Sequence, residues 1–596
     1  MDERELRALV SSVKAGDVSR RQFIRRMLAV GVTLPMAGTI LSHAGVAVAA
    51  SPFEYAPTKA GGGGTLRLLQ WQAPTQLNPH FATGTGDQHA VNIFYEPLAS
   101  WEMDGNLAPV LAEELPSLEN GGLSEDGRTV TWRLKQGVKW HDGAPFTADD
   151  CLFTAEYASD PATSAWTLAT YKDLDIEKVD DHTVRITFPS PNPFWADPFV
   201  GSRGFILPKH LFEQFKGADA RQAPINLAPV GTGPYVFVEL RPGDMLRGNA
   251  NPDYHVPNRP YFDALEMKGG GDATSAARAV LQTGEYDFAW NLSVEDDVLK
   301  RFETGGRGDV VFIPGANIEH IQMNFSDPWT EVDGERSSAK TEHPILKDAA
   351  VRQALGLLVD RAAVADYIYG RSGVATGNFI NSPEQFVSHD TEWTFDVEKA
   401  SSILDEAGWE KGGDGVRQKD GQRLKLVFQS TTNSSRQKTM MIVKQACDQV
   451  GIEMELKSVP DAVFFSSDPG NPDTFGKFYA DLQMYTSPMR EPDPGLFMQQ
   501  FLSTQISARD NSWQGRNVTR WRSETFDREH EASVSELDPI KRAAHFIAMN
   551  NLLIEESVVV PVIYRQVAAG ARKGLKAPLS TWTSYLWRIS DWYLEA

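Results

Sequence analysis

Residues 126–150, DGRTVTWRLKQGVKWHDGAPFTADD, form the stretch of sequence that says most about the fold. Apolar residues alternate with polar residues from Val130 to Leu134, and this alternation predicts a half-buried β-strand. Asp142-Gly143 is a turn signal that favours a hairpin. Thr147, with Asp150 three residues later, is typical of a capping box and predicts the start of a helix. The stretch therefore predicts a strand, a turn and a helix in close succession.

The same patterns recur on both sides of this stretch. Further strands are predicted at 65–70, 183–188 and 235–240, and helices at 348–369, 396–407 and 539–556. Asp396 caps the second of these helices and Gly408 closes it. Strands that alternate with helices over more than 500 residues favour an α/β protein of several lobes over a sandwich or a helix bundle.

The N-terminus has the order of an export signal. SRRQFIR at Ser19–Arg25 is a twin-arginine motif, and the moderately apolar segment Met27–Leu41 that follows is too short to span a membrane. AVAA at Ala47–Ala50 predicts cleavage near Ala49. We interpret residues 1–50 as a twin-arginine signal peptide and residues 51–64 as a flexible leader. The protein is therefore expected in the periplasm.

Composition excludes several classes of function. The formal net charge of −21 argues against nucleic acid or anionic lipid as a partner, and a hydrophobic content of 41% is ordinary for a globular protein. Two cysteines, Cys151 and Cys447, cannot form a disulfide scaffold, and each falls in a predicted helix. Buried free thiols are expected, with a single disulfide as the alternative.

No catalytic or metal-binding motif stands out. The chain has no phosphate-binding loop of the G-x-x-x-x-G-K-[ST] type, no G-x-S-x-G elbow and no H-E-x-x-H pair. Gly269–Asp272 is best explained as a turn into a helix capped by Asp272, and His141 as part of a hairpin turn. We therefore expect a non-enzymatic protein with no cofactor and no bound metal.

Four segments after the leader carry a resemblance to a known family. They are FYEPL at 94–98 with DGNLAP at 104–109, then the stretch at 126–150, then PVGTGPY at 229–235 with NPDY at 251–254, and VRQAL at 351–355 with Asp360-Arg361 and residues 400–409. With these segments, in this order, nearly the whole chain after the leader resembles the periplasmic substrate-binding proteins of peptide- and nickel-type ABC transporters, the family 5 extracellular solute-binding proteins. From their residues alone these blocks are architectural, because their glycines and prolines suit tight turns.

The resemblance implies a clamshell of the large three-lobe type. Lobe I would comprise residues 62–97, 229–312 and 558–596, lobe II residues 98–228, and lobe III residues 313–557. Two crossover strands, near Ile321–Phe325 and Val560–Arg565, would form the hinge. Ligand would bind in the cleft and stabilise the closed state, because only that state offers contacts to both sides.

The resemblance also implies ligand contacts at strand ends facing the cleft. These are Trp71, Gln72, Trp290, Asn291, Tyr485 and Arg490. Core packing is the alternative for the aromatic residues, and a solvated surface position is the alternative for Arg490. Peptide binders of the family hold the ligand's amino group with an aspartate where this chain has Pro488, although Glu491 or Asp493 could substitute. A peptide, an opine-like conjugate and an oligosaccharide all remain open as ligands.

The implied function is capture of a small solute and delivery to the permease subunits of an ABC importer in the inner membrane. We expect the protein to act as a monomer. An exported hydrolase and a ligand sensor with the same fold are the alternatives. Hydrolysis of a ligand would separate the first of these from a binding protein.

Overall fold

A computed structural model describes Ser12 and residues 53–70, 73–82, 84–103, 105–465, 470–511, 513, 515–580 and 582–595. Apart from Ser12, the predicted signal peptide lies outside the described residues, and so do Trp71 and Gln72. Within the described part of the chain, no helix is long and apolar enough to cross a membrane.

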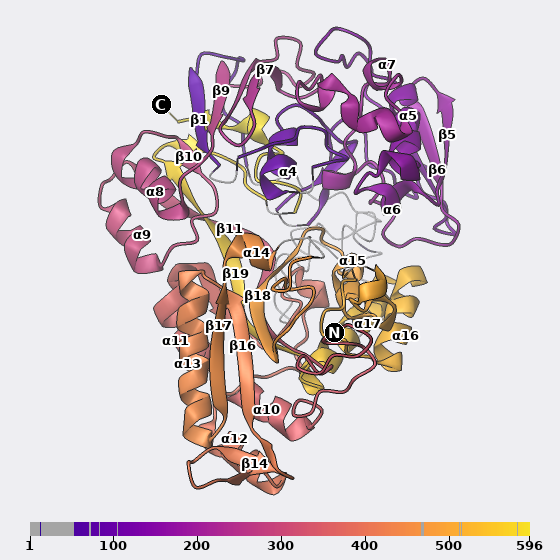
Figure 1. Ribbon diagram of the computed structural model, residues 1–596. Coiled ribbons are helices and arrows are strands. Elements are labelled where there is room, and N and C mark those ends of the chain that lie inside the picture. The colour runs from indigo at the N-terminus through magenta and orange to yellow at the C-terminus, as the bar shows by residue number, and fades with distance from the viewer. Residues whose placement is uncertain are drawn as a thin grey trace.

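One mixed sheet runs through two bodies of the molecule (Figure 1). The strand order is β17-β16-β18-β11-β19-β10-β1-β9-β8-β7, and β12 pairs with β19 outside this path. The bounds are β1 Thr65–Leu69, β7 Tyr235–Arg241, β8 Met245–Ala250, β9 Ala264–Lys268, β10 Phe288–Ala289, β11 Gly308–Met323, β12 Gly373–Ala375, β16 Lys425–Thr431, β17 Glu453–Val459, β18 Leu482–Met489 and β19 Val559–Arg572. The α/β class and the predicted strands β1 and β7 are confirmed.

Two long strands connect the bodies. β11 and β19 pair antiparallel; β19 also pairs with β10 in the upper body of Figure 1, and β11 with β18 in the lower body. Their register shifts between Ile313 and Asn317, so the ladder is interrupted where the chain passes from one body to the other. The two strands include most of the residues predicted for the hinge.

Helices cover the sheet of the lower body. α13 (Ser434–Val450) packs against β16 and β17, and α10 (Ala349–Leu357) packs against α12 (Val397–Glu406). The side chain of Asp396 accepts a hydrogen bond from the backbone N–H of Lys399, as a helix cap does, and α17 (Pro539–Glu555) occupies its predicted segment.

The prediction of one continuous helix from 348 to 369 is wrong. α10 ends at Leu357, and α11 (Arg361–Val364) starts a new helix whose first turn is capped by Asp360. Asp360 accepts from the N–H of Ala363, so its side chain competes with continuation of the preceding helix. The apolar periodicity extends across this break because both helices bury the same side.

The stretch at 126–150 folds as predicted. β4 (Thr129–Arg133) pairs with β6 (Thr183–Thr187), which also pairs with β5 (Asp175–Asp180). α5 (Ala148–Ser159) begins with the predicted capping box, in which the N–H of Thr147 donates to Asp150 over 3.0 Å. Gly143 has a φ of 90°, which the turn requires and which glycine adopts without strain.

Two of the four segments shared with the family meet in a buried polar cluster around Glu96. Its carboxylate accepts from Tyr254 at 2.8 Å and Thr232 at 2.9 Å, and pairs with His255 at 2.9 Å. Burial opposes the charge, but His255 and these hydrogen bonds outweigh it and lower the pKa of Glu96. One carboxylate thus joins the first segment to both parts of the third, in agreement with an architectural role for these two segments.

The remaining local predictions also have outcomes. His141 accepts from the backbone N–H of Gly231 at 3.1 Å and contacts the carbonyl of Gly233 at 3.0 Å. These contacts attach the turn of His141 to the segment that leads into β7. Asp272 accepts from Ser275 and caps α8 (Ala273–Ala277). Cys151 and Cys447 are buried free thiols, as expected.

Candidate ligand-binding site

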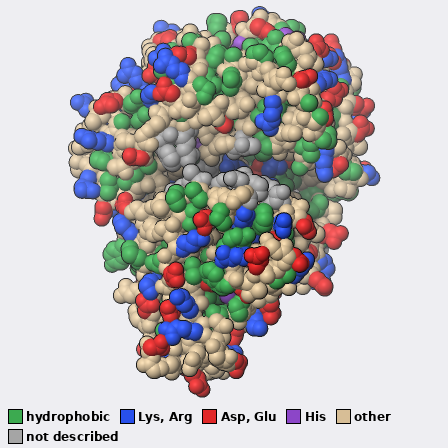
Figure 2. Space-filling view, in the orientation of Figure 1, with side chains coloured by type: hydrophobic (Ala, Val, Ile, Leu, Met, Phe, Trp, Pro, Cys, Tyr) green, Lys and Arg blue, Asp and Glu red, His purple; other side chains and the backbone are tan. Residues whose placement is uncertain are grey.

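Lobes II and III touch on the side of the cleft away from β11 and β19. Arg203 of lobe II lies 3.3 Å from Glu491 of lobe III, measured from Nε to Oε1. A methyl group placed on Gly127 would lie 2.8 Å from Leu537, so the two lobes also meet at a turn of lobe II. The surface is hollowed between the two bodies (Figure 2). These contacts describe a closed clamshell.

Trp290 and Asn291 lie at the end of β10, as predicted. The N–H of Trp290 donates to the carbonyl of Leu69 at the end of β1, which leads into the undescribed Trp71-Gln72. The Trp290 ring is half-buried and runs nearly parallel to Tyr585, with an interplanar angle of 11° and centroids 6.3 Å apart. Asn291 has a φ of 54°, and its side chain accepts from Arg565 of β19 at 3.3 Å. Both residues therefore lie where lobe I meets the hinge.

His89 completes this aromatic group, and the sequence analysis did not find it. It lies on α4 (Thr85–Val91), edge-on to Trp290 and Tyr585, with centroids 4.8 and 4.7 Å away. Its Nδ1 is buried and has no hydrogen-bond partner among the described residues. Burial, with Arg490 nearby, lowers the pKa of His89 to about 3, so the ring is neutral at physiological pH.

Arg490 follows β18 directly and points toward lobe I. One of its guanidinium nitrogens donates to the side chain of Gln88, 402 residues away in sequence. Arg490 has exposed surface although protein surrounds it, and this desolvation lowers its pKa. Arg490 is thus not a free surface arginine, because its hydrogen bond to Gln88 links the end of β18 to α4, even though much of its side chain is exposed.

Tyr485 has a different environment from the other predicted contacts. It is buried in lobe III, where its ring packs against His320 and Phe475 and its hydroxyl donates to Gln322 at 3.1 Å. These contacts favour core packing, the alternative that the sequence left open for this residue.

The acidic residues near Pro488 already have partners. Pro488 is exposed and pairs in register with Asn317 of the hinge strand β11. Glu491 pairs with Arg203, and Asp493 receives two hydrogen bonds from Arg542, one of them 2.9 Å long. Neither carboxylate is therefore available to replace an aspartate at the position of Pro488.

The hinge carries polar contacts on its lobe III side. Glu319 of β11 is buried and pairs with Arg436 of α13 at 2.7 Å. At the start of the same helix, Ser434 and Lys438 contact Glu295 of lobe I, at 2.6 and 2.8 Å. α13 is thus attached both to the hinge strand and to lobe I.

A narrow groove beside the hinge has essentially no space for a water-sized sphere. Residues 316–318 of β11 line it together with apolar and aromatic residues, among them Phe379, Ile380, Met489, Phe497 and Tyr564. It is too small for a whole peptide, but it adjoins the strand that leads to Arg490.

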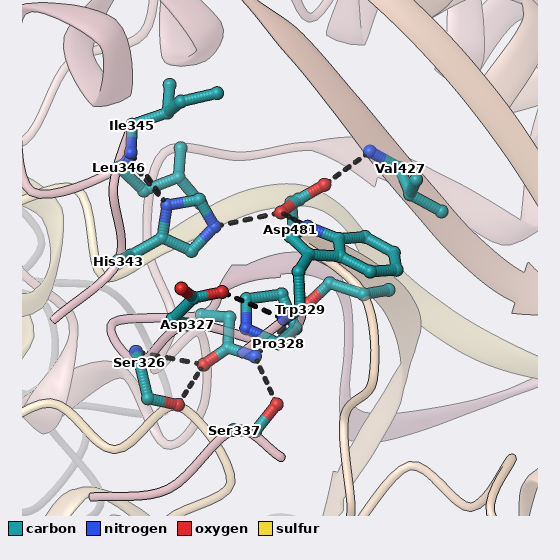
Figure 3. A network of polar contacts seen from close by, with 12 residues as sticks. Ser326, Asp327, Pro328, Trp329, Ser337, His343, Ile345, Leu346, Val427 and Asp481 are labelled. Carbon is teal, nitrogen blue, oxygen red and sulfur yellow. Dashed lines mark hydrogen bonds and ion pairs between the residues drawn. The ribbon is translucent and has the colours of Figure 1, made fainter. Parts of the chain in front are cut away.

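His343 and Asp481 form a buried His–Asp pair of the kind found in catalytic dyads (Figure 3). His343 and Asp481 are 2.9 Å apart, and Asp481 also accepts from Trp329 and from the backbone of Val427. The other ring nitrogen of His343 accepts from the backbone N–H of Ile345 and Leu346. Both ring nitrogens are occupied, so His343 cannot act as a base, and the pair anchors a loop.

Among the described residues, no group of three or more His, Cys, Asp or Glu side chains is arranged to hold a metal ion.

Comparisons with known proteins agree with this geometry. Residues 106–508 match the sequence model of the bacterial extracellular solute-binding proteins, family 5 Middle. The oligopeptide-binding protein AppA of Bacillus subtilis is 28% identical over 409 residues, which are 67% of this chain and 69% of AppA. The glutathione-binding protein GsiB of Pectobacterium atrosepticum is 27% identical over 387 residues, 65% of this chain and 67% of GsiB.

Among solved structures, NikZ of Campylobacter jejuni in complex with Ni(L-His) superposes with a TM-score of 0.72. The alignment covers 89% of this chain and 99% of NikZ at 22% sequence identity. This likeness concerns the fold, and it covers most of the chain.

Proposed function

Because the chain belongs to family 5 of the bacterial extracellular solute-binding proteins, we propose that it captures a small solute by closure of its lobes and delivers it to an ABC permease. Proteins of this family are periplasmic or extracellular binding proteins and not enzymes. One observation supports the proposal: Trp290 and Arg490 come from opposite bodies joined by β11 and β19, and they contact the neighbouring residues His89 and Gln88 of α4.

Closure follows from this arrangement. Lobe I (62–97, 229–312 and 558–596) and lobe II (98–228) would move against lobe III (313–557) about the two connecting strands. A ligand that contacts both Trp290 and Arg490 binds only the closed form fully, so it shifts the population toward that form. Closure around the ligand is the signal that a permease recognises.

Trp290, Asn291 and Arg490 are the ligand contacts that we propose among the described residues. We also propose Trp71 and Gln72, which follow β1 in the sequence. An aromatic face accommodates the apolar part of a ligand, and a guanidinium binds a carboxylate or hydroxyl. A peptide or peptide-like conjugate suits these groups best, and the names of AppA and GsiB point to the same class. An opine-like conjugate and an oligosaccharide are the other candidates.

The export route is part of the proposal. Ser19–Arg25 and Ala47–Ala50 support export through the twin-arginine pathway and cleavage near Ala49. The protein would then act as a monomer in the periplasm.

A thermal-shift panel of peptides, glutathione, opines and oligosaccharides tests the function on protein purified from the periplasm. A ligand at 100 times its Kd should add about 2.7 kcal/mol to the free energy of unfolding. We expect a saturable increase in melting temperature that Trp290→Ala or Arg490→Ala abolishes. Hydrolysis of any panel member by the protein would instead favour the hydrolase. If growth on the ligand does not depend on the permease, a sensor is favoured.

A further inference from the structure

The carboxylates around Arg490 are already paired with cations of the protein. Glu491 and Asp197 both face Arg203, at 3.3 and 3.8 Å. Asp493 pairs with Arg542, and Glu319 of the hinge pairs with Arg436. None of these acidic groups is left to receive a cationic group of a ligand without breaking a pair in a partly buried setting, which is costly.

The basic groups at the same place are not all paired. Within the described part of the chain, Arg490, Arg516 and Arg565 have no carboxylate within 4.0 Å. Arg490 donates to the side chain of Gln88, Arg516 to the carbonyl of Leu496 at 3.1 Å, and Arg565 to the side chain of Asn291 at 3.3 Å. Neutral acceptors satisfy some of their N–H groups. Glu491 acts on Arg490 and Arg516 from a longer distance, and Arg565 likewise lowers the pKa of Glu319, but none of the three arginines has an ion pair of its own.

Arg490, Arg516 and Arg203 form one electrostatic group. Desolvation lowers the pKa of Arg490 and of Arg516; Arg203 lowers both as well, and Glu491 raises both. Arg565 lies apart from this group, near Glu319. Among the described residues, the two carboxylates Glu491 and Asp197 stand against the three guanidinium groups, which leaves one positive charge in excess in this group. A positive site inside a protein with a formal net charge of −21 is a local feature that needs a counter-charge.

Given the proposed function, we infer that the cleft selects a solute bearing a single negative charge as a carboxylate, which contacts Arg490, and that a free α-amino group is not required. The guanidinium fork of arginine matches a carboxylate in two parallel hydrogen bonds. One excess positive charge balances a carboxylate, whereas a phosphate dianion would be left with unpaired negative charge beside Glu491.

The neighbouring wall defines the rest of the ligand. His89 lies between Arg490 and the rings of Trp290 and Tyr585, and its buried Nδ1 has no partner among the described residues. The ligand would therefore carry an apolar or planar group against Trp290 and a hydrogen-bonding group within reach of His89, close to its carboxylate.

Matched peptides test the charge preference directly. The probes are Gly-Phe-Ala, N-acetyl-Gly-Phe-Ala and Gly-Phe-Ala-amide, with glutathione, agropinic acid and maltotriose added as other chemical classes. Calorimetry on the whole exported protein measures each Kd. We expect the acetylated acid to bind within about threefold of the free peptide, and the amide to bind at least about tenfold more weakly, as the loss of hydrogen bonds between charged groups predicts.

Arg490→Gln should reduce binding of the two acids to the level of the amide and leave the amide unchanged. Arg185→Gln is the matched control, because it removes a 2.7 Å ion pair with Glu177 on the exposed face of lobe II. Equal binding of acid and amide, or much tighter binding of the free amine than of its acetylated form, would overturn this inference and leave the proposed function intact. Tight binding of maltotriose alone would do the same. If none of the six probes binds, the proposed function is contradicted as well.

Discussion

The ion pair between Arg203 and Glu491 should set how often the cleft is closed in the absence of ligand. Both side chains are 15% exposed and lie 3.3 Å apart, on lobes II and III respectively. Substitution of Arg203 by Met keeps much of the side chain's bulk and removes the charge. It also leaves Asp197 and Glu491 facing each other without a shared cation, so their repulsion favours separation of the lobes.

The size of the effect follows from the distance and the burial. At an effective dielectric constant of about 20, two charges 3.3 Å apart attract by about 5 kcal/mol. Desolvation of the two groups offsets much of this, and about 1–3 kcal/mol remains for a partly buried pair. Arg203→Met should therefore reduce the ratio of closed to open molecules by about 5-fold to 150-fold.

Electron spin resonance distances between lobes II and III measure this ratio. Spin labels on Asp175→Cys and Glu398→Cys report on exposed sites of lobes II and III. The native thiols of Cys151 and Cys447 are fully buried, and burial raises the pKa of each, so neither competes for the label.

We expect the Arg203→Met distances to shift toward the longer, open population. Lys340→Met is the control, because it removes an exposed 2.7 Å pair with Asp333 that lies entirely within lobe III. Identical distance distributions for Arg203→Met and the native protein would refute the reasoning.

Three further predictions concern stability, and the last of them compares two substitutions. Burial raises the pKa of Asp197 to about 6 from 3.8, so the charged carboxylate destabilises the folded protein above pH 6, and this cost disappears as the pH falls. Asp197→Asn should therefore stabilise the protein at pH 8 by up to about 3 kcal/mol and have no effect near pH 3. Urea unfolding at the two pH values measures the difference. Glu96→Leu leaves three buried partners unsatisfied and should cost about 3–5 kcal/mol in the same assay, and an equal stability would contradict the assigned cluster. Gly231→Ala places a methyl group 1.8 Å from the carbonyl oxygen of Phe94 and should prevent folding to a soluble protein. Gly356→Ala lies in a helix with open space around it, so it should be neutral or stabilising by up to about 1 kcal/mol. Expression level and melting temperature compare the two variants.

The outcome for the helix predicted at 348–369 illustrates the limit of local patterns. Apolar spacing predicted that these residues pack on one side, and both α10 and α11 do so. The break between them depends on whether the side chain of Asp360 bonds to the N–H of Ala363, which periodicity does not report. By contrast, the cap at Asp396 and the capping box at Thr147 were identified correctly, because each involves only residues three positions apart.

The sequence by itself predicted β1, β4, β6 and β7, the caps of α5 and α12, and the turn at Asp142-Gly143, because each of these rests on residues near one another in the chain. Together with the family resemblance, it also predicted Trp290 and Arg490 as ligand contacts, and these residues directly follow β10 and β18.

Only the tertiary structure decided which groups meet in the cleft. Gln88 and Arg490 are 402 residues apart, and His89 and Arg203 carry no local signal that separates them from other residues of their type. Whether a carboxylate is available to a ligand depends on the cation nearest to it in space. Glu491 and Asp493 read alike in sequence, and folding alone assigns them Arg203 and Arg542 as partners.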